Sequence, residues 1–176
     1  MLRININTQQ GTIEKYNNLH ILCQNVINAL YNDENTNDNF NMDSFQVNGI
    51  INIEGDNNLT DLNCVDKKTG VYIFLNRRYN PVYIGVAGQG KKTKHSLRER
   101  LQIQLNAHNT NGTLAKNIMN IKKKICYTKK CKKKLIKNFA PNLIVISLGK
   151  SSPKNNSKAQ VLEKILTAIF DPVYNK

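Results

Sequence analysis

The sequence predicts an α+β fold in which a small central sheet of three strands, mixed or antiparallel, is flanked by helices. Two short runs, residues 70–74 and 82–85, are rich in β-branched and aromatic residues and enclose a polar segment with Asn and Pro, as in a hairpin. A third, continuous apolar run at 142–148 follows Pro141 and is typical of a central strand. Apolar residues recur at helical spacing in several segments of the remaining chain.

The N-terminal third predicts one helix and little else that is regular. Apolar residues recur at helical spacing from Ile13 to Leu30, where His20 has no ligand-like companion and is expected to be structural. Residues 32–44 are polar and Asn-rich, which favours a loop or linker. Residues 45–47 and 50–53 around Asn48-Gly49 are compatible with an extra hairpin. We therefore divide the chain into an N-terminal part, 1–66, that contacts DNA or a dimer partner, and a core, 67–176.

Three helices are expected within the core. Ser96 followed by Glu99 has the spacing of a capping box, so a helix is predicted over 96–105. A second helix follows Thr113, with an apolar stripe that consists of Leu114, Ile118, Ile121 and Ile125. The last helix begins at Ser157 or Lys158 and ends before Pro172. The predicted order of core elements is β-β-α-α-β-α.

Composition limits the class of protein. A chain of 176 residues is long enough for one domain with a real core. No run is long and apolar enough to span a bilayer and the N-terminus lacks a signal-peptide core, so a cytoplasmic location is expected. The four cysteines are scattered without a second Cys or His pair, which argues against zinc and favours reduced thiols.

The charge of the chain favours a polyanionic partner. The sequence has 26 Lys+Arg against 12 Asp+Glu, a formal net charge of +14. An AT-rich genome would explain part of the lysine and asparagine content, but not the crowding of lysines into two regions. A run of lysines is usually a solvated face; with the motifs of the core described next, we interpret these regions as a DNA-binding surface. The residues assigned to it are Lys91, Lys92, Lys94, His95, Lys122, Lys123 and Lys124.

Four motifs in order resemble the GIY-YIG nuclease superfamily. Gly70-Val71-Tyr72 and Tyr83-Ile84-Gly85 match its two tripeptides, with Val71 replacing the usual Ile. Leu97-Arg98-Glu99-Arg100-Leu101 resembles the helix that carries the family's arginine, and Glu163 lies on a later helix as the family's glutamate does. The ending with Phe170, Pro172 and Asn175 is most similar to the type II restriction endonuclease branch. The resemblance covers the chain from about Gly70 to Asn175.

The resemblance implies a catalytic role for five residues. Tyr72 would be the general base, although a phenol needs a nearby cation to ionise near neutral pH. Tyr83 would hydrogen-bond the water or phosphate, and Arg100 would bind the scissile phosphate. Glu163 would ligate one divalent cation, Mg²⁺ or Mn²⁺. Asn175 would orient a phosphate or the water shell of the metal.

Each of these residues also has an ordinary structural interpretation. Strand tyrosines usually pack in a sheet, a helix glutamate is commonly exposed, and periodicity alone does not separate Arg100 from Arg98. Several restriction-type relatives carry a histidine where this chain has Gln104, which can donate a hydrogen bond but cannot shuttle a proton near pH 7. His108, one turn later, is an alternative supporting residue.

The sequence thus leads us to expect a metal-dependent DNA endonuclease, most similar to a site-specific type II restriction enzyme. It would act on double-stranded DNA as a homodimer, without a membrane partner, and with a cognate DNA methyltransferase encoded nearby. Three alternatives remain: a repair, phage or mobile-element endonuclease with low sequence specificity; a catalytically silent DNA-binding module; and an RNA-binding basic protein. The last is less favoured because clustered stacking aromatics are not evident.

Overall fold

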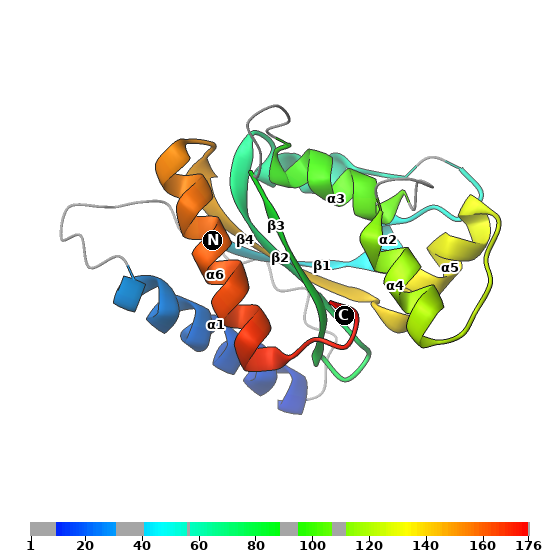
Figure 1. Ribbon diagram of the computed structural model, residues 1–176, viewed down its shortest axis with the longest axis horizontal. Helices are drawn as coiled ribbons and strands as arrows, with labels where there is room; N and C mark the ends of the chain where they lie inside the picture. Colours follow the sequence, from blue (N-terminus) through cyan, green and yellow to red (C-terminus); the bar gives the residue numbers. More distant parts are fainter. Residues whose placement is uncertain (1–9, 31–40, 56, 89–94, 107–111, 176) are drawn as a thin grey trace.

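A four-stranded antiparallel sheet forms the centre of the molecule. The computed structural model describes residues 10–30, 41–55, 57–88, 95–106 and 112–175. The strands lie in the order β1-β4-β2-β3 (Figure 1), so β4 and β2 are central. Their bounds are β1 (Asn41–Gln46), β2 (Lys68–Leu75), β3 (Pro81–Ala87) and β4 (Asn142–Lys150).

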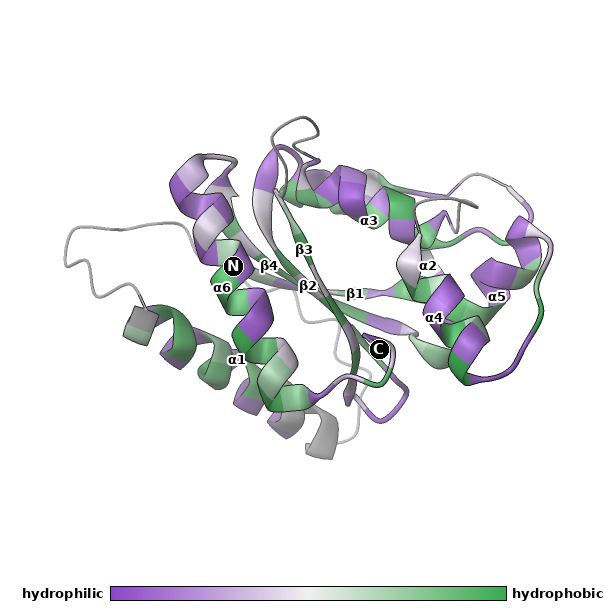
Figure 2. Ribbon diagram, in the orientation of Figure 1, coloured by the Kyte–Doolittle hydropathy of each residue, from purple (hydrophilic) through white to green (hydrophobic). Residues whose placement is uncertain are grey.

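Helices cover both faces of this sheet. They are α1 (Gln10–Leu30), α2 (Val47–Ile50), α3 (Leu97–Leu105), α4 (Thr113–Ile121), α5 (Lys129–Phe139) and α6 (Pro153–Phe170), with a 3-10 helix η1 (Thr60–Val65). In Figure 1, α1 and α6 lie on one side of the sheet and α3, α4 and α5 on the other. Figure 2 shows hydrophobic residues along the strands and a mostly hydrophilic α5.

Alternation along β2 explains the two layers. Val71, Ile73 and Leu75 pack with residues of α1 and α6, whereas Tyr72 and Phe74 pack with α3, α4 and α5. Successive side chains of a strand point to opposite faces, and both faces of β2 are buried. We call these the aliphatic face and the tyrosine face of the sheet.

The predicted α+β class is confirmed, but the expectation of three strands is wrong. The additional strand, β1, comes from a polar segment that was expected to be a loop. It pairs with β4 from Asn41↔Ser147 to Gln46↔Asn142, and Met42 is its one fully buried side chain. An edge strand held by main-chain hydrogen bonds needs few apolar residues, which is why periodicity missed it. The expected loop residues 32–40 lie outside the described part of the chain.

The extra hairpin after β1 is also wrong. Residues 47–50 form the short helix α2, and residues 51–53 belong to no strand. Val47, Ile50 and Ile51 are all buried at the i, i+3, i+4 spacing of a helix, and Val47 N–H donates to the Pro141 carbonyl. With η1 they join the core of the tyrosine face, so the N-terminal part shares one core with the rest.

The three predicted core helices are present and differ from the prediction only at their ends. The Ser96/Glu99 capping box is present at the start of α3. Helix α6 begins earlier than expected, at Pro153, with the Ser152 hydroxyl accepting from Asn155 N–H. Helix α4 stops at Ile121, so Ile125 is not on its stripe. Helix α5 was not expected from its lysine-rich sequence; its buried Leu135 and Ile136 anchor it to the core.

The expectation of four reduced cysteines is wrong for one pair. Cys126 and Cys131 form a disulfide, with Cα atoms 5.5 Å apart, while Cys23 and Cys64 are free. The Thr128 hydroxyl caps the first turn of α5 by accepting from Cys131 N–H. This turn places the Cys131 sulfur next to that of Cys126. Among the described helices, none has the length and apolar character to cross a membrane.

Candidate active site

Tyr72 lies at the centre of the tyrosine face and is 1% exposed. Its partner across the β2–β3 pair is Gly85. The Tyr72 ring lies over this glycine, because a Cβ built at Gly85 would overlap the phenol carbon and oxygen. The glycine of the second tripeptide therefore makes the space in which the tyrosine of the first one sits.

Gln104 fixes the direction of the hydrogen bond to Tyr72. Its Oε1 accepts from Leu114 N–H at 3.0 Å, at the start of α4. Its Nε2 must then be the donor, and it reaches the Tyr72 hydroxyl oxygen at 3.3 Å and the Thr113 hydroxyl at 3.1 Å. Gln104 is fully buried, so each of these bonds offsets a desolvation cost.

Tyr83 lies beside Tyr72, with ring centroids 6.3 Å apart. Its hydroxyl is 2.5 Å from the Thr113 hydroxyl, which Gln104 also contacts. The two phenols are thus connected through Gln104 and Thr113. Thr113 was not among the residues singled out from the sequence; the indication available was that it opens a predicted helix directly after a glycine, where side chains meet the helix N-terminus.

Arg100 acts directly on Tyr72. It lies one turn before Gln104 on α3, so the two side chains share a helix face. Burial raises the pKa of Tyr72 well above its usual value, and the neighbouring Tyr83 raises it further. The charge of Arg100 and hydrogen bonds from Gln104 and Arg100 lower that pKa, without overcoming burial. The structure thereby distinguishes Arg100 from Arg98, which does not act on Tyr72.

Glu163 lies elsewhere. It is a partly buried residue of α6, whose buried side chains Ala159, Leu162 and Leu166 pack on the aliphatic face. Within the described residues it makes no hydrogen bond or ion pair with Tyr72, Tyr83 or Arg100. Burial raises the pKa of its carboxyl group and the adjacent Lys164 lowers it. The structure therefore gathers Tyr72, Tyr83, Arg100 and Gln104, and does not join Glu163 to them.

The residues present are compatible with one divalent cation at Glu163. No group of three His, Cys, Asp or Glu side chains occurs among the described residues, which argues against a metal held by protein ligands alone. Mg²⁺, however, is usually held by one or two carboxylates and keeps several waters. A partly buried carboxylate whose ionised form is disfavoured by burial would gain from a bound cation.

Asn175 is placed at the outer edge of β3. Its Oδ1 accepts from Ile84 N–H and its Nδ2 donates to the Ile84 carbonyl, both at 2.8 Å. Tyr174 N–H donates to the Val82 carbonyl on the same edge. The side-chain amide thus continues the ladder of the strand that carries Tyr83. Its role toward a phosphate or metal stays a prediction, and the geometry assigns it a part in holding β3.

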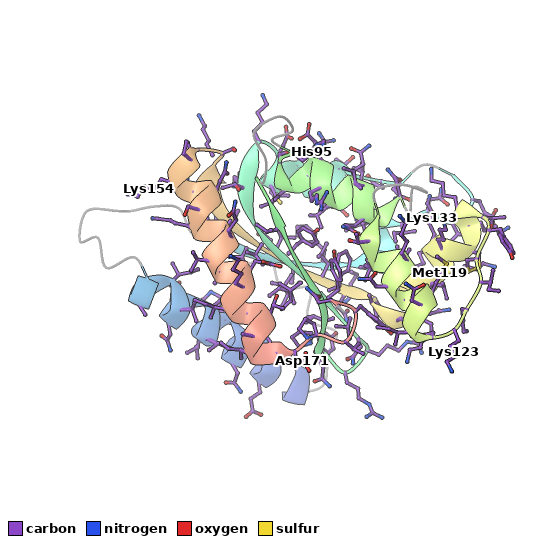
Figure 3. The ribbon with its side chains drawn as sticks, viewed as in Figure 1. His95, Met119, Lys123, Lys133, Lys154 and Asp171 are labelled. Atoms are coloured by element: carbon purple, nitrogen blue, oxygen red, sulfur yellow. A yellow bond between two sulfur atoms is a disulfide. The ribbon has the colours of Figure 1, made fainter. Side chains whose placement is uncertain are left out.

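The basic residues fall into different environments. His108, Lys91, Lys92 and Lys94 lie outside the described residues. His95 lies at the start of α3 (Figure 3), with Nδ1 3.8 Å from Glu99 Oε2. The C-terminal end of α4 is followed by three exposed lysines, Lys122, Lys123 and Lys124, of which Figure 3 labels Lys123. The ammonium groups of Lys122 and Lys124 lie over the Phe139 ring.

Comparison of the chain with profiles of known protein families, with characterised proteins and with solved structures finds no significant match. The resemblance stated above therefore depends on the quoted motifs and on the geometry of the residues they contain.

Proposed function

We propose that this protein is a metal-dependent endonuclease that hydrolyses DNA phosphodiester bonds. One observation carries the proposal: the buried Tyr72 hydroxyl receives a hydrogen bond from Gln104 and lies in the field of the Arg100 charge, which lowers its pKa, with Tyr83 beside it. An arrangement built only for packing would not require a guanidinium charge and a fixed amide near one phenol oxygen. A net charge of +14 supports a nucleic-acid substrate.

The side chains divide the chemistry among them. Arg100 binds a non-bridging oxygen of the scissile phosphate and neutralises the charge that develops there. Tyr72 holds the attacking water and takes its proton in the fraction of molecules in which the phenol is ionised, which Arg100 and Gln104 favour and burial opposes. Tyr83 and Thr113 position the water or phosphate from the adjoining strand and helix. A cation at Glu163 would supply further neutralisation of phosphate charge.

Within this proposal a site-specific restriction enzyme is the finer assignment, supported by the similarity of the Phe170/Pro172/Asn175 ending to that branch. Cutting both strands with one site per chain then requires a homodimer or two successive nicks. A cognate methyltransferase would be the expected genetic neighbour.

The test is digestion of phage and plasmid DNA with Mg²⁺ or Mn²⁺. Discrete fragments support site-specific restriction, and a smear supports a low-specificity endonuclease. Arg100→Ala should lower the cleavage rate by about 10²-fold or more, the loss typical of a transition-state donor. Arg98→Ala, on the same helix, is the matched control and should cut near the wild-type rate. Equal losses in the two variants would contradict the proposed site.

A second candidate, a catalytically silent DNA-binding module, is favoured by the separation of Glu163 from the tyrosines. The same digestion distinguishes it, since a silent module binds DNA and leaves it intact with either metal. Glu163→Gln tests the metal-ligand assignment: a variant that cuts as fast as wild type removes it.

A further inference from the structure

The segment between α4 and α5 presents two large apolar side chains to solvent. Ile125 is 76% exposed and Tyr127 is 86% exposed, the highest values among the large hydrophobic residues described. Cys126 between them is buried. In an extended segment, residues i and i+2 point to the same side. Ile125 and Tyr127 therefore share the outer side of this segment, which together with the first turn of α5 (residues 122–131) we name the Tyr127 loop.

Both ends of the Tyr127 loop are held in place. Helix α4 ends in a Schellman motif, in which Lys124 N–H donates to the Met119 carbonyl and Lys123 N–H to the Asn120 carbonyl. Lys123 takes the left-handed position of that motif, φ +50°, which glycine usually occupies. At the other end, the Cys126–Cys131 disulfide closes a ring that contains Tyr127. The exposure of Tyr127 is thus a feature of an anchored loop.

The charged residues of the loop itself are all cationic. Residues 122–134 contain lysines and no acidic residue. Lys130 is paired with Glu54 at 2.6 Å, and Lys133 is turned inward, donating to the carbonyls of Asn52 and Gly55. Lys123 and Lys129 remain exposed on either side of Ile125 and Tyr127. A surface on which apolar side chains lie between cationic ones is complementary to a ligand in which flat apolar groups alternate with anionic groups.

We propose that the Tyr127 loop is a duplex DNA contact in which Lys123 and Lys129 bind phosphates while Ile125 and Tyr127 lie against a base step. Such apolar side chains are used elsewhere to unstack or stack on bases, and the flanking lysines position the duplex. The inference depends on the proposed function only for the identity of the ligand. It adds the residues that contact bases, at the end of α4 away from Thr113.

The experiment measures binding without cleavage. The full chain is titrated in EDTA against a short labelled DNA duplex over a range of salt concentrations. Tyr127→Ala should weaken binding by about 5- to 100-fold, as for loss of one base–aromatic contact, and leave the salt slope unchanged. Lys123→Ala should reduce that slope by about one unit, since it removes a phosphate contact. Ile169→Ala, a 50% exposed residue of α6, is the matched control and should bind like wild type.

Two outcomes would overturn the inference. One is unchanged duplex binding by Tyr127→Ala, with a melting temperature equal to wild type. The other is an effect of Tyr127→Ala seen only with structured RNA or with vesicles of anionic lipid. The binding test does not depend on cleavage. A wild-type chain that binds duplex DNA through this loop and never cuts supports the inference and contradicts the endonuclease proposal. A Tyr127→Ala variant that cuts normally and binds duplex DNA as before contradicts the inference and supports the endonuclease proposal.

Discussion

The two faces of the sheet are built from the same strands but make different demands on the sequence. The aliphatic face meets α1 and α6 through side chains such as Val71, Ile73 and Leu162, which need only matching volume. The tyrosine face buries Tyr72 and Gln104, whose polar atoms must each find a partner. The comparison indicates that one face depends on packing volume alone, whereas the other also depends on specific polar contacts.

That division also explains why the tyrosine face is the less replaceable one. An aliphatic side chain can be exchanged for another of similar volume at modest cost. Removing Gln104 leaves the Leu114 N–H and the Tyr72 hydroxyl without their partner, and enlarging Gly85 displaces the phenol itself. Substitutions should therefore affect mainly stability on the aliphatic face, and both stability and activity on the tyrosine face.

The largest effect is expected on the aliphatic face. Leu162→Ala removes a fully buried side chain from the contact between α6 and the sheet, and should lower the free energy of unfolding by about 3 kcal/mol. Urea denaturation measures this loss. Cleavage per folded molecule should stay near wild type in stabilising conditions. A variant of wild-type stability would contradict the burial of Leu162 between α6 and the sheet.

A second prediction concerns alkaline pH and the tyrosine face. Burial raises the pKa of Tyr72 above the value of the unfolded chain, so the folded state holds this proton more tightly. Its contribution to stability is complete below pH 10 and falls above it, by about 1.4 kcal/mol for each pH unit until the folded pKa is reached. Tyr72→Phe should therefore flatten the loss of stability above pH 10.

The readout is the difference between wild type and Tyr72→Phe in urea denaturation at several alkaline pH values. Burial also raises the pKa of Tyr174, and that of Cys23 to about 12, so these groups destabilise both proteins in the same direction. Tyr174→Phe is the comparison, since it removes that second buried phenol and leaves the contribution of Tyr72 in place. Parallel stability curves for wild type and Tyr72→Phe would show that Tyr72 does not titrate as a buried phenol.

The sequence predicted those parts of the fold that local chemistry determines. The strands that contain Tyr72 and Tyr83, the capping box at Ser96 and the central strand at 142–148 follow from residue type and spacing within short windows. β1 could not be found this way, because main-chain pairing with β4 holds it and few of its side chains are buried. Helix α5 was missed because Lys133 belongs to its buried side, with its ammonium held by backbone carbonyls.

In the candidate site, too, some features follow from the local sequence and others depend on long-range packing. Arg100 and Gln104 are one helical turn apart, so the sequence could place them on one face of a helix, but only the fold directs that face at Tyr72. Thr113 reaches the tyrosines from the start of another helix, across a segment that carries no periodic signal. The expected meeting of Glu163 with the tyrosines needed the long-range packing of α6, which no local pattern encodes, and α6 packs on the aliphatic face.

The smallest expected effect is the most specific to the tyrosine face. Gln104→Leu removes one neutral hydrogen bond to the Tyr72 phenol and should lower the cleavage rate by about tenfold, equivalent to about 1.4 kcal/mol. Because the Gln104 bond lowers the pKa of Tyr72, its loss should also shift the rising limb of the pH–rate profile to higher pH. Gln102→Leu, an exposed position on the same helix, is the matched control and should leave both rate and profile unchanged. A Gln104→Leu variant slowed at every pH by the same factor would indicate that Gln104 positions the Tyr72 ring without tuning its proton affinity.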